Sequence, residues 1–221
     1  MLPDLPQTEI AIVEMTNAFR KENRLGALKP NAVLAAAARA FAQYLAKSGK
    51  FAHEADGREP QQRAEAQGYR YCLVAENLAT NLDSRGFESR QLASEAIEGW
   101  KESPGHRANM LQAGVTEIGV AVVEAPDKNP KYISVQLFGR PDSLKIKFSV
   151  ENRTGSPVRY ALGEEAHTLP ARTIVTHTMC DASLLMFETA GTSMKFEIYN
   201  GDKFTARTGS GGSVEVKREA K

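Results

Sequence analysis

Apolar residues recur every three or four positions over residues 31–47, the repeat of one buried helix face: Leu34, Ala38, Phe41, Ala42 and Leu45. Asn31 is a favourable N-cap, and Gly49 is a favourable residue just beyond the last turn. Both ends of this helix are therefore marked locally. Comparable patterns predict three more helices, over residues 8–24, 60–67 and 88–102.

The pattern changes to alternation after residue 115. Residues 116–124 and 131–138 are rich in valine and isoleucine and flank a turn, which predicts a β-hairpin. Residues 69–74 are aromatic and β-favouring, and they predict one extended segment further upstream. Helices followed by paired antiparallel strands indicate an α+β domain over residues 1–140, in which helices cover the sheet.

From Pro141 onward the sequence changes to short segments that are typical of β-strands. They are separated by turn signals and cover residues 143–150, 157–162, 172–180, 183–188, 193–199 and 203–207. Their spacing predicts a second, small all-β module over residues 141–221, a sandwich or a barrel. Residues 208–221 begin with TGSGGS and end charged, so they form either a last edge strand or a flexible tail.

The composition narrows the class of protein. The net charge is +1, hydrophobic residues make up 42% and charged residues 25%, as in ordinary globular proteins. Such a balance argues against a nucleic-acid partner bound through charge. No apolar run reaches the roughly 20 residues of a transmembrane helix, and the start MLPDLPQTE has no signal-peptide pattern. Cys72 and Cys180 are expected to be buried free thiols, with an interdomain disulfide as the alternative.

Three residues carry candidate chemistry: His53, Glu76 and His106. Each follows a predicted element and lies near glycine, proline or a turn, where a rigid scaffold commonly presents functional side chains. If they converge, two neutral imidazoles and a carboxylate suit zinc with an open water position. Glu76 could otherwise act as a base or orient a histidine. For His106 alone, hydrogen bonding to the local backbone is the alternative.

Other arrangements are less favoured by the sequence. It contains no GxSxG elbow, phosphate-binding GxxxxGK loop or HExxH motif. A nucleophilic site built on Cys72, a histidine and Glu76 is conceivable, because Cys72 lies four residues before Glu76. His167 and His177 are expected at surface or hairpin positions of the β module, without a functional role.

Several motifs together resemble one known family. In chain order they are FAH (51–53), DGR (56–58), GYRY (68–71), AENLA (75–79), Trp100, SPGHRANML (103–111) and TEIGVAVV (116–123). This set is similar to the bacterial branch of the CAP superfamily, the SCP-like group of cysteine-rich secretory, antigen-five and pathogenesis-related-one proteins. The resemblance covers residues 8–139. It implies a three-layer α-β-α sandwich with an open cleft, usually in secreted or envelope proteins.

The resemblance also implies a cleft with two histidines and two glutamates. His53, Glu76 and His106 match three of these four positions, but Ser103 stands where the second glutamate is expected. The neighbouring Glu102 would point about 100° away around a helix. The family glycine before the glutamate is Ala75 here. Members of the family have been associated with divalent metals, sterols, fatty acids and proteolysis.

These observations lead to one hypothesis with two alternatives. The leading one is an exported CAP-domain protein whose cleft binds zinc or another divalent cation through His53, His106 and Glu76, with a lipid-like or sterol-like small ligand or a protein as partner. The first alternative is a metal-dependent, peptidase-like hydrolase in which Glu76 moves a proton from a metal-bound water. The second is a non-catalytic module in which these residues hold loops together or bind a partner.

Overall fold

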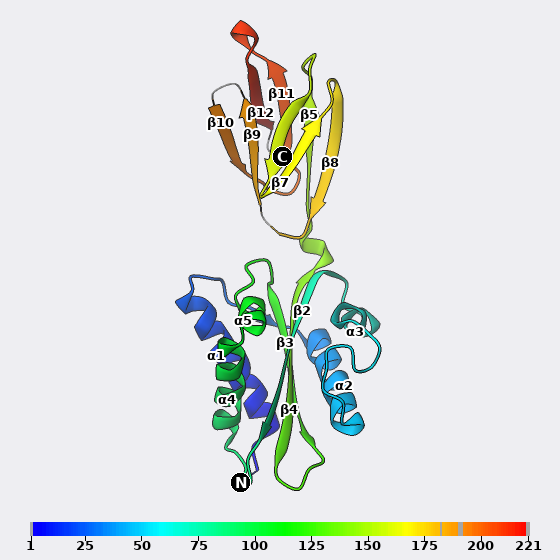
Figure 1. The fold of residues 1–221 in the computed structure, drawn as a ribbon, viewed down its shortest axis with the longest axis vertical. Helices are drawn as coiled ribbons and strands as arrows, with labels where there is room; N and C mark the ends of the chain where they lie inside the picture. The colour runs from blue at the N-terminus through cyan, green and yellow to red at the C-terminus, as the bar shows by residue number, and fades with distance from the viewer. Residues whose placement is uncertain (1, 182, 190–191, 220–221) are drawn as a thin grey trace. The chain divides into compact units, whose positions relative to one another are not determined.

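The chain divides into two units, residues 1–143 and 144–221. The computed structural model describes residues 2–181, 183–189 and 192–219, and Figure 1 traces them from the N-terminus to the C-terminus. The domain boundary expected after residue 140 falls at the end of strand β4 (Lys131–Pro141). Each unit has its own hydrophobic core.

Five helices belong to the first unit: α1 (Leu5–Glu22), α2 (Ala32–Ser48), α3 (Pro60–Ala66), α4 (Ser89–Glu102) and α5 (Pro104–Met110). Local sequence explains the ends of α2. The Asn31 side chain accepts the backbone N–H groups of Val33 and Leu34, and Gly49 closes the helix with a left-handed φ of 70°. Pro104 starts α5 directly after α4, and Ser103 between them is extended, with ψ of 118°.

A four-stranded sheet forms the middle of the first unit, in the order β1-β3-β4-β2. Its strands are β1 (Lys29–Pro30), β2 (Tyr71–Leu82), β3 (Glu117–Ala125) and β4. The predicted hairpin is confirmed, because β3 and β4 pair antiparallel. The expected short extended segment at residues 69–74 is too short. Pairing with β4 continues to Leu82, and Glu76 therefore lies within strand β2 rather than after it.

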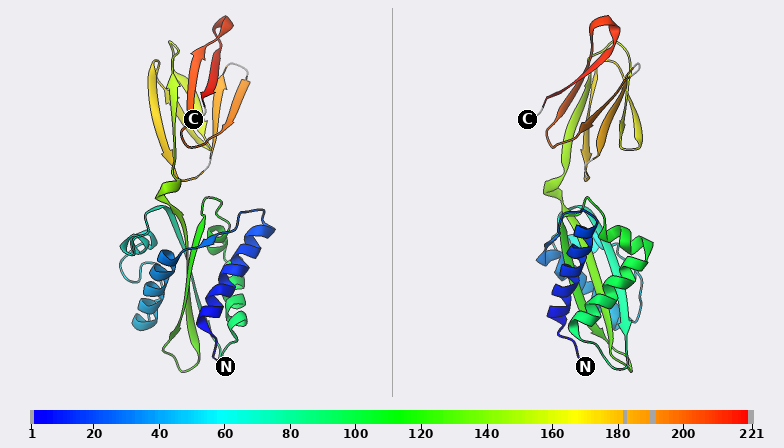
Figure 2. Two further views of the ribbon diagram at one scale, coloured as in Figure 1. Left: turned by 180° about the vertical axis from the view of Figure 1, so that it is seen from behind. Right: turned by 90° about the vertical axis from the view of Figure 1, so that its left-hand side faces the viewer.

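Helices cover both faces of this sheet, as Figures 1 and 2 show. Alternate residues of β3 face opposite sides: Val120 and Val122 pack with α1 and α4, and Ala121 packs with α2. The approach of α2 is close, since a Cβ atom on Gly119 would lie 2.3 Å from the backbone of the helix. The three-layer α-β-α sandwich is confirmed.

The second unit consists of two four-stranded sheets, ordered β10-β9-β6-β7 and β12-β11-β5-β8. The strands are β5 (Ile146–Asn152), β6 (Val158–Leu162), β7 (Glu165–Leu169), β8 (Thr173–Met179), β9 (Leu184–Thr189), β10 (Thr192–Glu197), β11 (Lys203–Thr208) and β12 (Val214–Glu219). Single 3-10 turns cover Asp142–Leu144 and Ser210–Gly212. The small all-β module is confirmed. Of the two expectations for residues 208–221, β12 is an edge strand, and residues 220–221 lie outside the described residues.

The two cysteines differ from the sequence expectation. Neither is a free thiol: Cys72 and Cys180 are both disulfide-bonded. Local sequence could not decide between the two states, because bonding depends on which side chains the fold brings together. Within the described part of the chain, none of the helices combines the length and apolar character that crossing a membrane requires.

Candidate functional site

Three elements bring the predicted residues together at the β2 edge of the sheet. His53 follows α2, Glu76 lies in β2, and His106 is the third residue of α5. His53 Nδ1 lies 2.9 Å from Glu76 Oε1. The imidazole centroids of His53 and His106 are 6.3 Å apart, and their planes are inclined by 54°. The geometry therefore unites His53, Glu76 and His106 in one site.

Arg63 on α3 completes the site, and the sequence offered no motif that pointed to it. Its Nη2 donates to both Glu76 oxygens, at 2.9 and 2.8 Å, and its Nη1 donates to Asp56 Oδ1 at 2.9 Å. The guanidinium also lies over the Phe41 ring, 3.5 Å from its centroid. The side chains of Arg63 and Glu76 are only 5% and 1% exposed, so this is a buried ion pair in which one guanidinium nitrogen contacts both carboxylate oxygens.

Two asparagines attach α5 to β2 behind the histidines. Asn109 Nδ2 donates to the Glu76 carbonyl oxygen at 3.0 Å and to Asn77 Oδ1 at 2.9 Å. Asn77 Nδ2 in turn donates to the His106 carbonyl at 3.1 Å and to Gln136 Oε1 at 3.0 Å. These amides hold the backbones of Glu76 and His106 in register. Both asparagines lie inside the AENLA and SPGHRANML motifs, which was the available signal for them.

The two histidines of the site differ in electrostatics. The hydrogen bond to Glu76 raises the pKa of His53, although burial and Arg63 oppose it. Burial, followed by the nearby His53, lowers the pKa of His106. When neutral, His53 carries its proton on Nδ1, because Glu76 accepts there, and its lone pair is then on Nε2. The site can therefore present imidazole nitrogens as ligands.

The structure also shows the surroundings of Ser103, which stands where the second glutamate was expected. Ser103 is half-buried at the junction of α4 and α5, and its side chain makes no capping hydrogen bond. Glu102 is exposed on α4. Across the described ranges, no group of three or more histidine, cysteine, aspartate or glutamate side chains is arranged to hold a metal ion.

The histidines of the second unit are both partly buried, and the predicted hairpin position is confirmed for His167, which lies in the second strand of the β6–β7 hairpin. His167 in β7 and His177 in β8 have ring centroids 5.3 Å apart, and the His167 side chain is 23% exposed. Both contact Tyr160, which is 3% exposed. The alternation of β7 and β8 places these side chains on the inner faces of the two sheets.

The fold and the site with His53, Glu76 and His106 agree with the family that a sequence comparison finds. The sequence model of the cysteine-rich secretory protein family, known as CAP, matches residues 13–138. That match covers more than half of the 221 residues, and the chain belongs to this family.

Particular relatives can be named by similarity. The chain is 30% identical over 118 residues to the uncharacterized protein YkwD of Bacillus subtilis; the match covers 53% of this chain and 43% of YkwD. The chain thus matches less than half the length of that relative.

Two solved structures have a similar fold, both with a TM-score of 0.51. An outer surface protein of Borrelia burgdorferi is 22% identical, over 59% of this chain and 90% of that one. An extracellular protein containing an SCP domain from Bacillus anthracis is 24% identical, over 62% of this chain and 41% of that one.

Proposed function

We propose that this CAP-domain protein binds a divalent transition metal, such as zinc, through the imidazoles of His53 and His106. The observation that carries the proposal is the Glu76 carboxylate, which accepts a hydrogen bond from His53 Nδ1 at 2.9 Å. Histidines that ligate metals commonly donate their other ring N–H to a carboxylate, which sets the tautomer and the ring orientation. The same bond leaves Nε2 of His53 available to a metal.

The donor set fits a borderline-soft cation with an incomplete protein coordination shell. Two imidazoles on one tetrahedral zinc place their ring centroids about 5 Å apart, slightly closer than the 6.3 Å found here. His53 is 48% exposed, so its side chain can make that adjustment. The remaining positions would be open to water or to a ligand. Bound metal would supply a Lewis acid at this edge of the sheet.

We assign Glu76 to orientation rather than to ligation. Both of its oxygens accept hydrogen bonds from Arg63, and one also accepts from His53. A carboxylate held in this way by a buried guanidinium is poorly placed to approach a metal or to take a proton from water. The geometry therefore favours binding over the hydrolase alternative, in which Glu76 would be the base. The absence of a glutamate at Ser103 agrees with this preference.

Zinc titration of the full, unreduced chain tests the proposal. Calorimetry of the wild-type protein should give one zinc ion per chain, and His53→Ala or His106→Ala should abolish that binding. Glu76→Gln should weaken it about 10–100-fold, as expected for an orienting partner. His167→Ala, which alters the histidine pair of the second unit, is the matched control and should bind as the wild type does. Undiminished zinc binding in both first-unit histidine variants would contradict the proposal.

We also propose that the protein acts outside the cytoplasm. Disulfides persist in oxidising compartments, and both cysteines of this chain are disulfide-bonded. Membership in a family described as secretory supports the same location. Protein recovered from the native host should be found in an extracytoplasmic fraction with both cysteines resistant to alkylation until a reductant is added. Recovery from the cytosol with alkylated cysteines would exclude export.

A further inference from the structure

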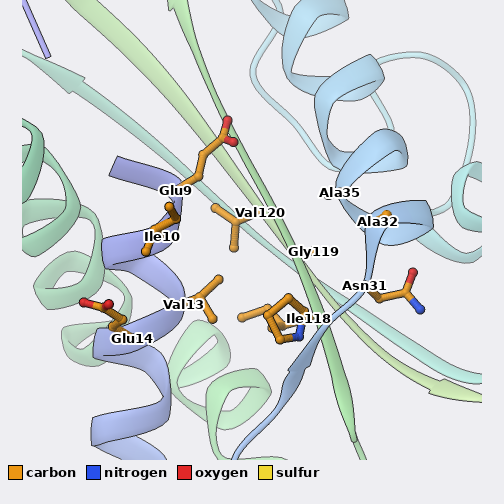
Figure 3. A pocket seen from close by; sticks show the side chains of 11 residues that line it. Glu9, Ile10, Val13, Glu14, Asn31, Ala32, Ala35, Ile118, Gly119 and Val120 are labelled. Carbon is orange, nitrogen blue, oxygen red and sulfur yellow. The ribbon is translucent and has the colours of Figure 1, made fainter. Parts of the chain in front are cut away.

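A groove lies at the opposite edge of the first unit's sheet from the histidines. It has a volume of about 520 Å³, and residues of α1, β3 and the start of α2 line it. Figure 3 shows Val13 of α1 beside Ile118 and Val120 of β3, with Ala32 and Ala35 of α2 across the groove. The lining is mainly apolar, and the α2 side carries only small side chains. A site of this kind is unrelated to the proposed metal site.

The floor of the groove is a strand edge that is only partly paired. Strand β1 pairs with β3 at two positions, Lys29 with Glu117 and Pro30 with Ile118, and the chain then enters α2. Beyond Ile118, β3 has β4 on one side and no strand on the other within the described residues. Unpaired strand edges are templates for pairing with another extended chain.

The backbone groups of Val120 face the groove. The Ile118 carbonyl accepts the Asn31 N–H at 2.8 Å, and the Val122 N–H donates to Glu9 Oε1 at 2.9 Å. Both of these groups point away from β4. Backbone direction repeats every second residue, so the N–H and C=O of Val120 point the same way. At Val122 a side-chain carboxylate already takes the place that a carbonyl of a neighbouring strand would occupy.

The charged side chains of the groove indicate which kind of ligand it would favour. Among the residues that line it, the charged side chains are two glutamates, Glu9 and Glu14. Glu9 is held by Arg39 and by the Val122 N–H. Glu14 is 61% exposed, and its contact with Arg90 is a loose 3.7 Å, so it can exchange that partner for another cation.

We propose that this groove binds an extended peptide segment of a partner protein, which adds as a strand to the edge of β3 and carries a lysine or arginine toward Glu14. Main-chain hydrogen bonds to Val120 would provide affinity, and the apolar walls would accept alternate side chains. A second folded copy does not suit the groove. Helices α1 and α2 wall it on both sides, so an extended segment fits between them better than the surface of a folded domain does.

Nuclear magnetic resonance of the ¹⁵N-labelled full chain tests this proposal with a defined probe. The probe is an N-acetylated, C-amidated octapeptide in which valine alternates with lysine and threonine. Binding should shift the Val120 amide signal and slow its exchange with solvent, while the already bonded Val122 amide exchanges as before. The same peptide with every second backbone nitrogen methylated should bind about five- to tenfold more weakly, because it loses a main-chain hydrogen bond to β3.

Variants separate strand addition from simple apolar binding. Val120→Pro removes the N–H that faces the groove and no hydrogen bond to β4, and should weaken the peptide about tenfold. Because the Val120 side chain also packs in the core, the variant is used only if its ¹H–¹⁵N spectrum shows the native fold. Ile10→Lys, at a lining residue that is 51% exposed, should also weaken it, whereas Ile174→Lys, at an exposed isoleucine of the second unit, should not. Glu14→Gln should weaken it about two- to threefold. Equal binding of the methylated peptide, a preference for decanoate over the peptide, or an unmoved Val120 amide at millimolar peptide would overturn the proposal.

Discussion

His53 and His106 face each other at the β2 edge of the first unit's sheet, whereas His167 and His177 face each other between the two sheets of the second unit. Behind the first pair lies a buried carboxylate, Glu76, fixed by a guanidinium. The second pair lies among aromatic rings, and the Glu165 carboxylate 3.7 Å from His167 Nε2 is 78% exposed rather than buried. His167 stacks on Tyr160 and His177 stacks on Phe148, each with ring centroids 5.1 Å apart.

The hydrogen-bond partner of each imidazole helps to explain why the pKa values of His53 and His177 shift in opposite directions. His53 donates to a carboxylate, which favours its protonated form and raises its pKa. His177 Nε2 lies 2.7 Å from the Tyr160 hydroxyl, and burial raises the pKa of Tyr160 to about 12, so the phenol stays protonated and donates. The pKa of His177 is lowered, mainly by burial and then by His167. The same residue type therefore hydrogen-bonds a buried carboxylate in one unit and a buried tyrosine hydroxyl in the other.

Of the variants considered, replacing Arg63 should cause the largest loss of stability. Arg63→Met leaves the Glu76 carboxylate buried without its counter-charge, and should lower the free energy of unfolding of the first unit by about 3–5 kcal/mol. Trp100, the single tryptophan, is buried in the first unit and reports urea unfolding there. Arg39→Met, which removes an exposed partner of Glu9, is the control and should cost less than about 1 kcal/mol. A similar small loss for both variants would mean that Glu76 is not held as described.

Truncating Tyr160 tests the second pair at a smaller scale. Tyr160→Phe keeps the ring but removes the hydroxyl that bonds His177, and should destabilise the second unit by about 1–3 kcal/mol. Thermal unfolding followed by far-ultraviolet circular dichroism measures the loss. Tyr199→Phe is matched in chemistry, because Tyr199 is 55% exposed and bonds Glu197, and its effect should be close to zero. Equal stability of the two variants would mean that the hydrogen bond between Tyr160 and His177 does not stabilise the second unit.

Titration of the histidines gives the smallest but most direct contrast. The pKa of His177 in the folded chain lies below 6.5, so its contribution to stability is present above that pH and is lost as pH falls toward the folded value. The pKa of His53 lies above 6.5, so its contribution is present at lower pH and is lost as pH rises through the folded value. In the metal-free protein, the Cε1 proton shifts of His53 and His177 should therefore have titration midpoints on opposite sides of pH 6.5. Coincident midpoints would contradict the contrast.

Helix α2 illustrates how well local sequence predicts local structure. The cap at Asn31, the apolar stripe and the glycine at position 49 all act within a few residues, and the helix was predicted to within one residue at each end. Strand β2 shows the limit. Its sequence suggests an extended segment that ends at Val74, but pairing with β4 carries it to Leu82. That pairing depends on residues about sixty positions away.

The candidate site divides in the same way. The order of motifs along the chain was enough to select His53, Glu76 and His106, since motif residues carry their chemistry with them. Arg63 could not be selected, because an arginine on a short helix has no signal of its own until the fold places a buried carboxylate against it. The contacts of His167 and His177 with Tyr160 could not be predicted for a related reason. Alternation marks two faces of a strand, but only packing of the second sheet decides which face is inside.

The sequence by itself therefore determined the family, the helices with strong caps, the β3–β4 hairpin, and the three residues at the centre of the site. These features depend on short-range periodicity and on ordered motifs. The tertiary structure alone decided that Glu76 pairs with Arg63, that His167 and His177 both contact Tyr160, and that the edge of β3 borders an apolar groove. Each of these depends on contacts between elements far apart in the chain, whose energies come from burial and desolvation that no local pattern encodes.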